Sequence, residues 1–122
     1  MNARMSSKGV WVMGLVSLAL VLVGSTVHAE PLERVEAVRV CMVNNTVFPK
    51  DQIPVEVDGK TYFGCCEMCK GRLAKDEAIR MATDPVSGKQ VDKATAIIGA
   101  GADGKVQYFE SEETFARFGK GA

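Results

Sequence analysis

The sequence predicts an α+β fold in which two small tandem ββα units pack together, and three observations support this prediction. Residues 53–63 and residues 94–109 each alternate apolar and polar side chains around an Asp-Gly pair, which is typical of a β-hairpin. Each hairpin is followed by a segment with the apolar spacing of a short helix. The two halves also match each other in sequence, which indicates an internal duplication.

Residues 1–29 are interpreted as a secretory signal peptide. Arg4 and Lys8 precede an uncharged apolar run from Val10 to Val23, and Val27-His28-Ala29 fits a signal-peptidase site. The run is shorter than the roughly 20 apolar residues of a membrane-spanning helix, so an uncleaved anchor is the less favoured alternative. We expect a periplasmic or secreted protein that does not associate with a membrane after cleavage.

Removal of the signal peptide limits the chemistry of the mature chain. Cleavage leaves 93 of the 122 residues and takes away His28, the only histidine, so a metal site must use thiolates, carboxylates or thioethers. The remaining 13 basic and 15 acidic residues are too balanced for nucleic acid or an anionic membrane surface to be the partner. With no acid–base pair and no phosphate-binding loop, we expect that the protein is not an enzyme.

The mature chain is predicted to divide, in order, into a loose leader, a first unit, a second unit and a short tail: residues 30–37, 38–83, 84–118 and 119–122. In the first unit, the hairpin leads into a helix expected from about Cys66 through Ile79 to about Ala82, before the breaker Asp84-Pro85. In the second unit, a helix should begin after Ser111, a suitable N-cap followed by acidic residues.

Alignment of the two halves places the thiols of the first half opposite residues without thiols in the second. With Gly64 taken as an insertion, "GKTYFGCCEMCKGRL" matches "GKVQYFESEETFARF", and upstream "VCMVNN" is set against "DPVSGK". The resulting pairs are Cys41 with Ser87, Cys65 with Glu110, Cys66 with Ser111 and Cys69 with Thr114. We therefore expect the second unit to support the fold without carrying a site.

The four cysteines are the candidate metal ligands: Cys41, Cys65, Cys66 and Cys69. Spacings of three and four residues at a helix start place sulfurs on one face, and the hairpin can bring Cys41 beside them. Thiolates favour soft or borderline ions, so Cu(I) and Zn(II) are the expected metals. We expect heavy-metal binding and trafficking with a metal-donor or metal-acceptor protein as partner, and the sequence leaves open a homodimer.

Other uses of the thiols stay open. An even number of cysteines in an exported chain favours disulfides, so disulfides or zinc could staple a structural interaction module. Bridges within the cluster, however, would be vicinal or close very short loops. Cys66-Glu67-Met68-Cys69 is a C-x-x-C pattern, which would suit a thiol–disulfide redox partner. Met42 and Met68 flank the cysteines and are interpreted as packing residues rather than thioether ligands.

The first half resembles a known family. Cys41, followed by Cys65-x3-Cys69 after an aromatic hairpin and by Leu73 at the end of the helix, resembles a TRASH domain. That family is associated with trafficking, resistance and sensing of heavy metals. The resemblance implies that Cys41, Cys65 and Cys69 are the ligands, and that Cys66 is an extra thiol for a fourth coordination position or for transfer.

The second half resembles the related YHS domain. The matching segments are "DPVSGKQVD" and "YFESEETFARF", although Ser87, Glu110 and Thr114 stand where that family usually has cysteines. This resemblance therefore implies no metal site in the second unit. Together the two resemblances cover nearly all of residues 38–118 and imply folds similar to zinc ribbons or treble clefs.

Overall fold

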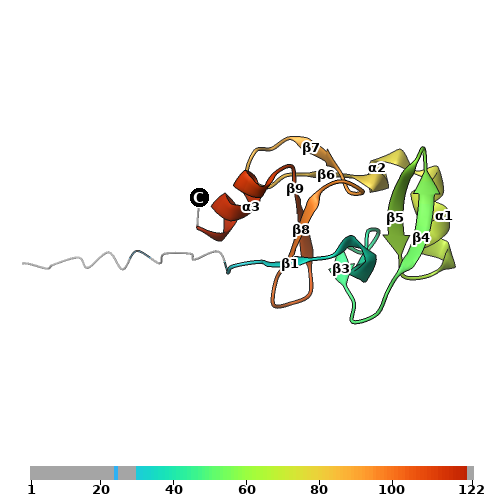
Figure 1. Ribbon diagram of the computed structural model, residues 1–122, viewed down its shortest axis with the longest axis horizontal. Coiled ribbons are helices and arrows are strands. Elements are labelled where there is room, and N and C mark those ends of the chain that lie inside the picture. Colours follow the sequence, from blue (N-terminus) through green and yellow to red (C-terminus); the bar gives the residue numbers. More distant parts are fainter. Residues whose placement is uncertain (1–23, 25–29, 121–122) are drawn as a thin grey trace, which may run out of the picture.

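The computed structural model describes Gly24 and residues 30–120, and this part of the chain has a mixed α+β fold (Figure 1). The predicted signal peptide lies outside the described residues, apart from Gly24, as do the last two residues of the predicted tail. Among the described helices, none has both the length and the apolar character needed to cross a membrane.

The described chain is built from short strands and short helices. In order they are β1 (Glu33–Val35), the 3-10 helix η1 (Ala37–Arg39), β2 (Val40–Cys41), β3 (Thr46–Val47), β4 (Ile53–Val57), β5 (Lys60–Gly64), α1 (Glu67–Lys75), α2 (Glu77–Arg80), β6 (Met81–Thr83), β7 (Gln90–Asp92), β8 (Ile97–Ala100), β9 (Val106–Phe109) and α3 (Glu112–Gly119). All strand pairs are antiparallel, and they form one sheet in the order β1-β8-β9 and three two-stranded sheets, β2-β3, β4-β5 and β6-β7.

Both predicted hairpins are confirmed. The β4–β5 hairpin turns at Asp58 and Gly59, whose φ angles are 51° and 78°. Positive φ at both central residues is the geometry that an Asp-Gly pair favours, and it fixes the register of the strands. In the β8–β9 hairpin, Gly104 adopts a φ of 81° within a longer connection. The prediction that a helix begins after Ser111 is also confirmed, because Ser111 caps α3 by accepting from the Thr114 N–H.

The segment interpreted as a loose leader contains an ordered strand. Residues 33–35 form β1, which adds to the edge of β8, and Arg34 lies opposite Gly99. The space beside Gly99 is already filled, since a Cβ built there would lie 2.7 Å from Phe115 Cε2 and 2.9 Å from Leu32 Cβ. The glycine thus allows Leu32 and β1 to pack over the second half.

The prediction of one helix reaching about Ala82 is wrong. Helix α1 ends at Lys75, and Asp76 takes an extended conformation in which its side chain accepts from the Ala78 N–H. This local bond offers the backbone an alternative to continuing the helix. The short α2 follows, and residues 81–83 then form β6 against β7. Sequence reasoning missed this strand pair altogether.

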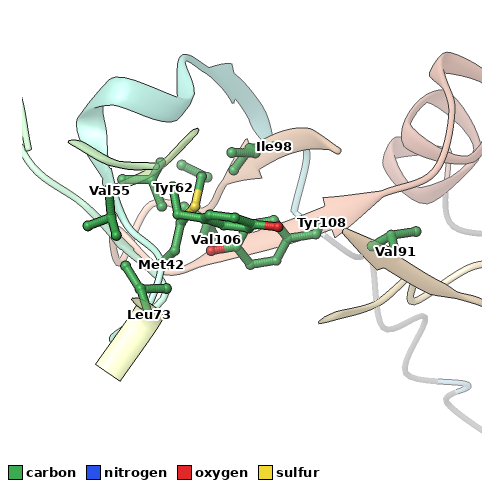
Figure 2. Close-up of a cluster of buried hydrophobic side chains, with 10 residues drawn as sticks. Met42, Val55, Tyr62, Leu73, Val91, Ile98, Val106 and Tyr108 are labelled. Carbon is green, nitrogen blue, oxygen red and sulfur yellow. The ribbon is translucent and has the colours of Figure 1, made fainter. Parts of the chain in front are cut away.

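Both halves contribute to one apolar core, part of which is drawn in Figure 2. Its buried members are Val40, Met42, Val55, Tyr62 and Leu73 from the first half, and Val91, Ile98, Ala100, Val106 and Tyr108 from the second. The two tyrosines make reciprocal bonds between the halves. Tyr62 donates to Asp92 Oδ1 at 2.8 Å, and Tyr108 donates to Asn45 Oδ1 at 3.0 Å. The finer description as tandem modules of zinc-ribbon type stays a prediction.

Candidate metal site

Three cysteines from separate elements converge. Cys41 ends β2, Cys65 follows β5 directly, and Cys69 lies in the first turns of α1. Their three Sγ atoms all lie within 4.8 Å of one another. Strand β2 reaches the end of β5 through a bond from the Met42 N–H to the Phe63 carbonyl, 2.8 Å long. The long-range approach of Cys41 to the other two thiols, expected from the sequence, is therefore present.

Gly64 allows α1 to start close to β5. A Cβ at this position would lie 3.0 Å from Cys69 Cβ and 3.2 Å from the Lys70 backbone nitrogen. A side chain here would push the helix away from the strand and move Cys69 away from Cys65. The sequence alignment treated Gly64 as an insertion, whereas its missing side chain helps to bring two of the sulfurs together.

The spacing of the sulfurs fits a soft metal ion. Zn–S bonds of about 2.3 Å place tetrahedral sulfurs roughly 3.8 Å apart, and trigonal sulfurs roughly 4.0 Å apart. The Cys65 and Cys69 sulfurs are 3.5 Å apart, and the Cys41 sulfur lies within 4.8 Å of both. All four cysteines are free thiols, since a disulfide requires sulfurs about 2.05 Å apart. The triad can hold a metal ion after changes of about 1 Å or less in the distances between its sulfurs.

The three thiols of the triad differ in acidity. Burial raises the pKa of Cys41, but hydrogen bonding from the backbone N–H groups of Asn44 and Val43 outweighs burial and lowers it. Hydrogen bonding with the Cys41 sulfur raises the pKa of Cys65 to about 12, and burial raises the pKa of Cys69. Cys41 is thus the member of the triad that most readily carries negative charge.

Cys66, the fourth predicted ligand, lies at the rim of the triad. It is exposed and occupies the N-cap of α1, and its Sγ lies 3.5 Å from the Cys69 Sγ. It does not belong to the set whose sulfurs are all within 4.8 Å of one another. The nearby backbone N–H of Cys69 lowers the pKa of Cys66, as expected at a helix N-terminus. Cys66 therefore offers a reactive thiol between the triad and solvent.

The two methionines beside the cysteines differ from each other. Met42 is fully buried and packs in the core, so its interpretation as a packing residue is confirmed. Met68 is 76% exposed, so the same interpretation is wrong for this residue. Its position in the first turn of α1 leaves the side chain directed away from the core. The thioether of Met68 and the thiol of Cys66 are both accessible from solvent.

Sequence reasoning missed two polar residues next to the triad. Asn44 Nδ2 donates to Cys65 Sγ at 3.5 Å, which is the outer support expected for a sulfur ligand. Lys93 is buried, and its Nζ donates to the Met42 carbonyl at 2.8 Å and to Asn45 Oδ1 at 3.0 Å. The one available signal for Lys93 was the position of the charged pair Asp92-Lys93 between Val91 and the apolar residues 96–98.

The turn that carries Cys41 has a counterpart in the second half. In the first half, four residues connect Cys41 to its strand partner Thr46. In the second half, four residues connect Asp84 to Lys89, and the Asp84 N–H donates to the Lys89 carbonyl at 2.9 Å. The last residue of each connection has positive φ, 52° at Asn45 and 74° at Gly88. This geometry pairs Cys41 with Asp84.

Asp84 is the polar equivalent of Cys41, so the alignment of Cys41 with Ser87 is wrong. The Asp84 carboxylate is fully buried and accepts from the N–H groups two and three residues later, those of Val86 and Ser87. Its Oδ2 accepts from the Glu110 N–H and from the Thr114 hydroxyl, at 2.8 Å and 2.7 Å. Because Thr114 is the counterpart of Cys69, a direct hydrogen bond in the second half joins the two positions that carry thiols in the first.

Comparisons with models of protein families, with curated proteins and with solved structures find no match to this chain.

Proposed function

We propose that this chain is an exported heavy-metal-binding protein that holds Cu(I) or Zn(II) through Cys41, Cys65 and Cys69 and passes the ion to another protein. The observation that carries the proposal is the convergence of these three sulfurs within 4.8 Å. The resemblances of residues 38–83 to a TRASH domain and of residues 84–118 to a YHS domain favour the same class of function. The signal-like residues 1–29 support export.

The rim of the site suits transfer of the ion by ligand exchange. An incoming soft donor approaches from solvent, where Cys66 is exposed and its Sγ lies 3.5 Å from Cys69 Sγ. A new metal–sulfur bond then forms as one of the triad's metal–sulfur bonds breaks. The metal and the sulfurs keep their oxidation states, so no oxidant or reductant is needed. Exposed Met68 adds a thioether that Cu(I) accepts as a ligand.

A structural zinc staple is the second candidate, and one observation favours it. In the second half, the bond between Asp84 and Thr114 closes a turn against a helix start without any metal. A zinc ion held by Cys41 and Cys69 would close the equivalent turn in the first half. In this alternative the ion stays bound and the function lies in a protein interface.

Metal titration separates the two candidates. The full exported chain is purified under anaerobic reducing conditions and titrated with Cu(I) and Zn(II) against competing chelators. Trafficking predicts one ion per chain, loss of binding in Cys41→Ser, and release of the ion to a thiol acceptor within minutes. Cys66→Ser is the matched control, since it removes a thiol outside the triad. We expect it to keep binding and to slow transfer.

Three results would contradict the proposal or replace it. Native protein with all sulfurs in disulfides and no bound ion would refute metal binding. Zinc that does not exchange with added copper or chelator would favour the staple. Transfer that is equally fast in Cys66→Ser would remove Cys66 from the mechanism and leave the triad as the binding site.

A further inference from the structure

Lys93 is a buried cation without a carboxylate partner in the described chain. It is only 5% exposed, and its Nζ donates to two neutral oxygens, the Met42 carbonyl and Asn45 Oδ1. The ammonium also faces the Tyr108 ring, with its Nζ 5.2 Å from the ring centroid. None of the ion pairs between described residues includes Lys93. Burial of an unpaired charge costs free energy, so a nearby anion is expected to stabilise this ammonium.

The neighbouring carboxylate does not supply that anion. Asp92 precedes Lys93 in the chain, but its Oδ2 accepts from Lys60 at 2.7 Å and its Oδ1 accepts from Tyr62 at 2.8 Å. The Lys93 backbone N–H, in turn, donates to the Arg80 carbonyl. The side chains of Asp92 and Lys93 therefore form hydrogen bonds with different groups and not with each other.

The candidate anion for Lys93 is the triad of cysteines in its deprotonated form. Lys93 bonds the carbonyl of Met42, the residue directly after Cys41. Burial lowers the pKa of Lys93 to about 8, and the one charged group that opposes this shift is the Cys41 thiolate. Because the Met42 carbonyl directly follows Cys41, the ammonium lies near the triad, and negative charge on the thiolates would attract it although the two belong to different halves of the sequence.

We infer that Lys93 is the counter-charge of the metal site and that it favours the metal complex with the greater negative charge. This inference rests on the proposed function. Three thiolates with Cu(I) carry a net charge of −2, whereas three thiolates with Zn(II) and a water carry −1. A fixed ammonium stabilises the first complex about twice as strongly as the second, because Coulomb energy is proportional to charge. Lys93 is thus a positioning and specificity-determining residue that the second half contributes to the site of the first.

The test compares charge removal with charge conservation at this position. Lys93→Gln keeps hydrogen-bond donors for the Met42 and Asn45 oxygens but loses the charge, and Lys93→Arg keeps the charge. Lys89→Gln is the matched control, since Lys89 is 73% exposed and its loss changes the net charge of the chain equally. Affinities for Cu(I) and Zn(II) are measured at pH 7 by chelator competition, in wild type and in the Cys66→Ser background. That background prevents Zn(II) from recruiting a fourth thiolate.

We expect Lys93→Gln to lower the Cu(I) affinity about tenfold more than the Zn(II) affinity, from the extra unit of charge. Lys93→Arg should restore the ratio of the two affinities to within about threefold, and Lys89→Gln should leave it unchanged. Equal losses for both metals would mean that Lys93 acts through the fold alone and would overturn the inference. An unchanged ratio with unchanged affinities would overturn it as well.

Two further controls keep the test decisive. If Lys93→Gln does not fold, as judged by circular dichroism, Lys93→Met takes its place as a neutral variant of similar length. Wild-type protein that binds neither ion would refute both the proposed function and this inference. Tight binding by wild type, with no change of the Cu(I) to Zn(II) ratio in the neutral variants, would refute the inference alone.

Discussion

Asp84 holds in the second half the position that Cys41 holds in the first, at the start of a four-residue turn that faces a helix N-terminus. Both side chains are fully buried. The carboxylate of Asp84 has a direct partner in Thr114, whereas the sulfurs of Cys41 and Cys69 interact only weakly as thiols. A bound cation should therefore stabilise the first half more than the second half.

Metal binding should protect the first half selectively. We expect amide hydrogen exchange in residues 41–46 and 65–69 to slow when the ion binds, while residues 84–89 and 110–114 change little because the Asp84–Thr114 bond is already formed. At a free metal concentration about 100 times the dissociation constant, the free energy of unfolding should rise by about 2.7 kcal/mol. Removal of the ion with a chelator should reverse both effects. Equal protection of the two turns would contradict the difference between the halves.

The Asp84 carboxylate should make stability depend on pH in acid. Burial raises its pKa, but hydrogen bonds from Glu110, Thr114, Val86 and Ser87 outweigh burial and hold the pKa below the ordinary 3.8. A lowered pKa in the folded state means that the charged form contributes stability above about pH 4. This contribution is lost as the pH falls below 3.8 and through the folded-state pKa.

Asp84→Asn should therefore be destabilised at pH 7 by about 2 kcal/mol, because one of its amide hydrogens faces backbone or hydroxyl donors. The difference from wild type should shrink as the pH falls from 5 to 3, and denaturant unfolding at each pH measures it. Asp51→Asn is the control, since Asp51 lies on the surface and should change stability by less than about 0.5 kcal/mol. A difference that stays constant down to pH 3 would show that the charge of Asp84 has no part in stability.

The sequence was informative where local rules determine the structure. The Asp-Gly turns, the Ser111 cap and the grouping of Cys65 with Cys69 depend on residues close together in the chain, and all are present. The approach of Cys41 followed from the hairpin that lies between Cys41 and the other cysteines. These features required no knowledge of how the halves pack.

Features that depend on the packing of distant segments were not predictable in the same way. Strand β1 forms because Gly99 leaves room for Leu32, and nothing near residue 33 in the sequence indicates this. Lys93 carries no motif, and its proximity to Cys41 depends on the packing of the two halves. The equivalence of Asp84 and Cys41 was hidden because the connecting segments differ in length, and identical residues are too few to set the register.

The reciprocal tyrosine bonds should contribute to the coupling of the halves. Tyr62→Phe removes the donor to Asp92, and Tyr108→Phe removes the donor to Asn45. Each variant should lose about 1 kcal/mol of stability, since Asp92 Oδ1 keeps the Ala94 N–H as a donor and Asn45 Oδ1 keeps Lys93. Thermal unfolding should remain a single transition in both. A second transition in either variant would show that the one remaining hydroxyl bond is not enough to keep the two halves a single cooperative unit.

Gly64, the last residue of β5, and Gly71, inside α1, should respond in opposite ways to alanine. Gly64→Ala adds a Cβ about 3.0 Å from Cys69 Cβ, too close for an ordinary contact, so α1 must move away from β5. We expect weaker metal binding, by roughly tenfold or more, because Cys69 moves relative to Cys65. Gly71→Ala meets no atom within 4 Å and replaces a glycine inside the helix. It should stabilise the protein by up to about 1 kcal/mol and leave metal affinity unchanged.

Affinity measurements and denaturant unfolding on the same two variants separate the effect on the site from the effect on the fold. The expected pattern is a loss of affinity in Gly64→Ala that exceeds its loss of stability, with the opposite sign of stability change in Gly71→Ala. Unaltered affinity in Gly64→Ala would mean that the Cys65–Cys69 distance does not depend on the close approach of α1 and β5. In that case Cys41 and Cys65, which lie on strand ends, would have to provide the fixed part of the site.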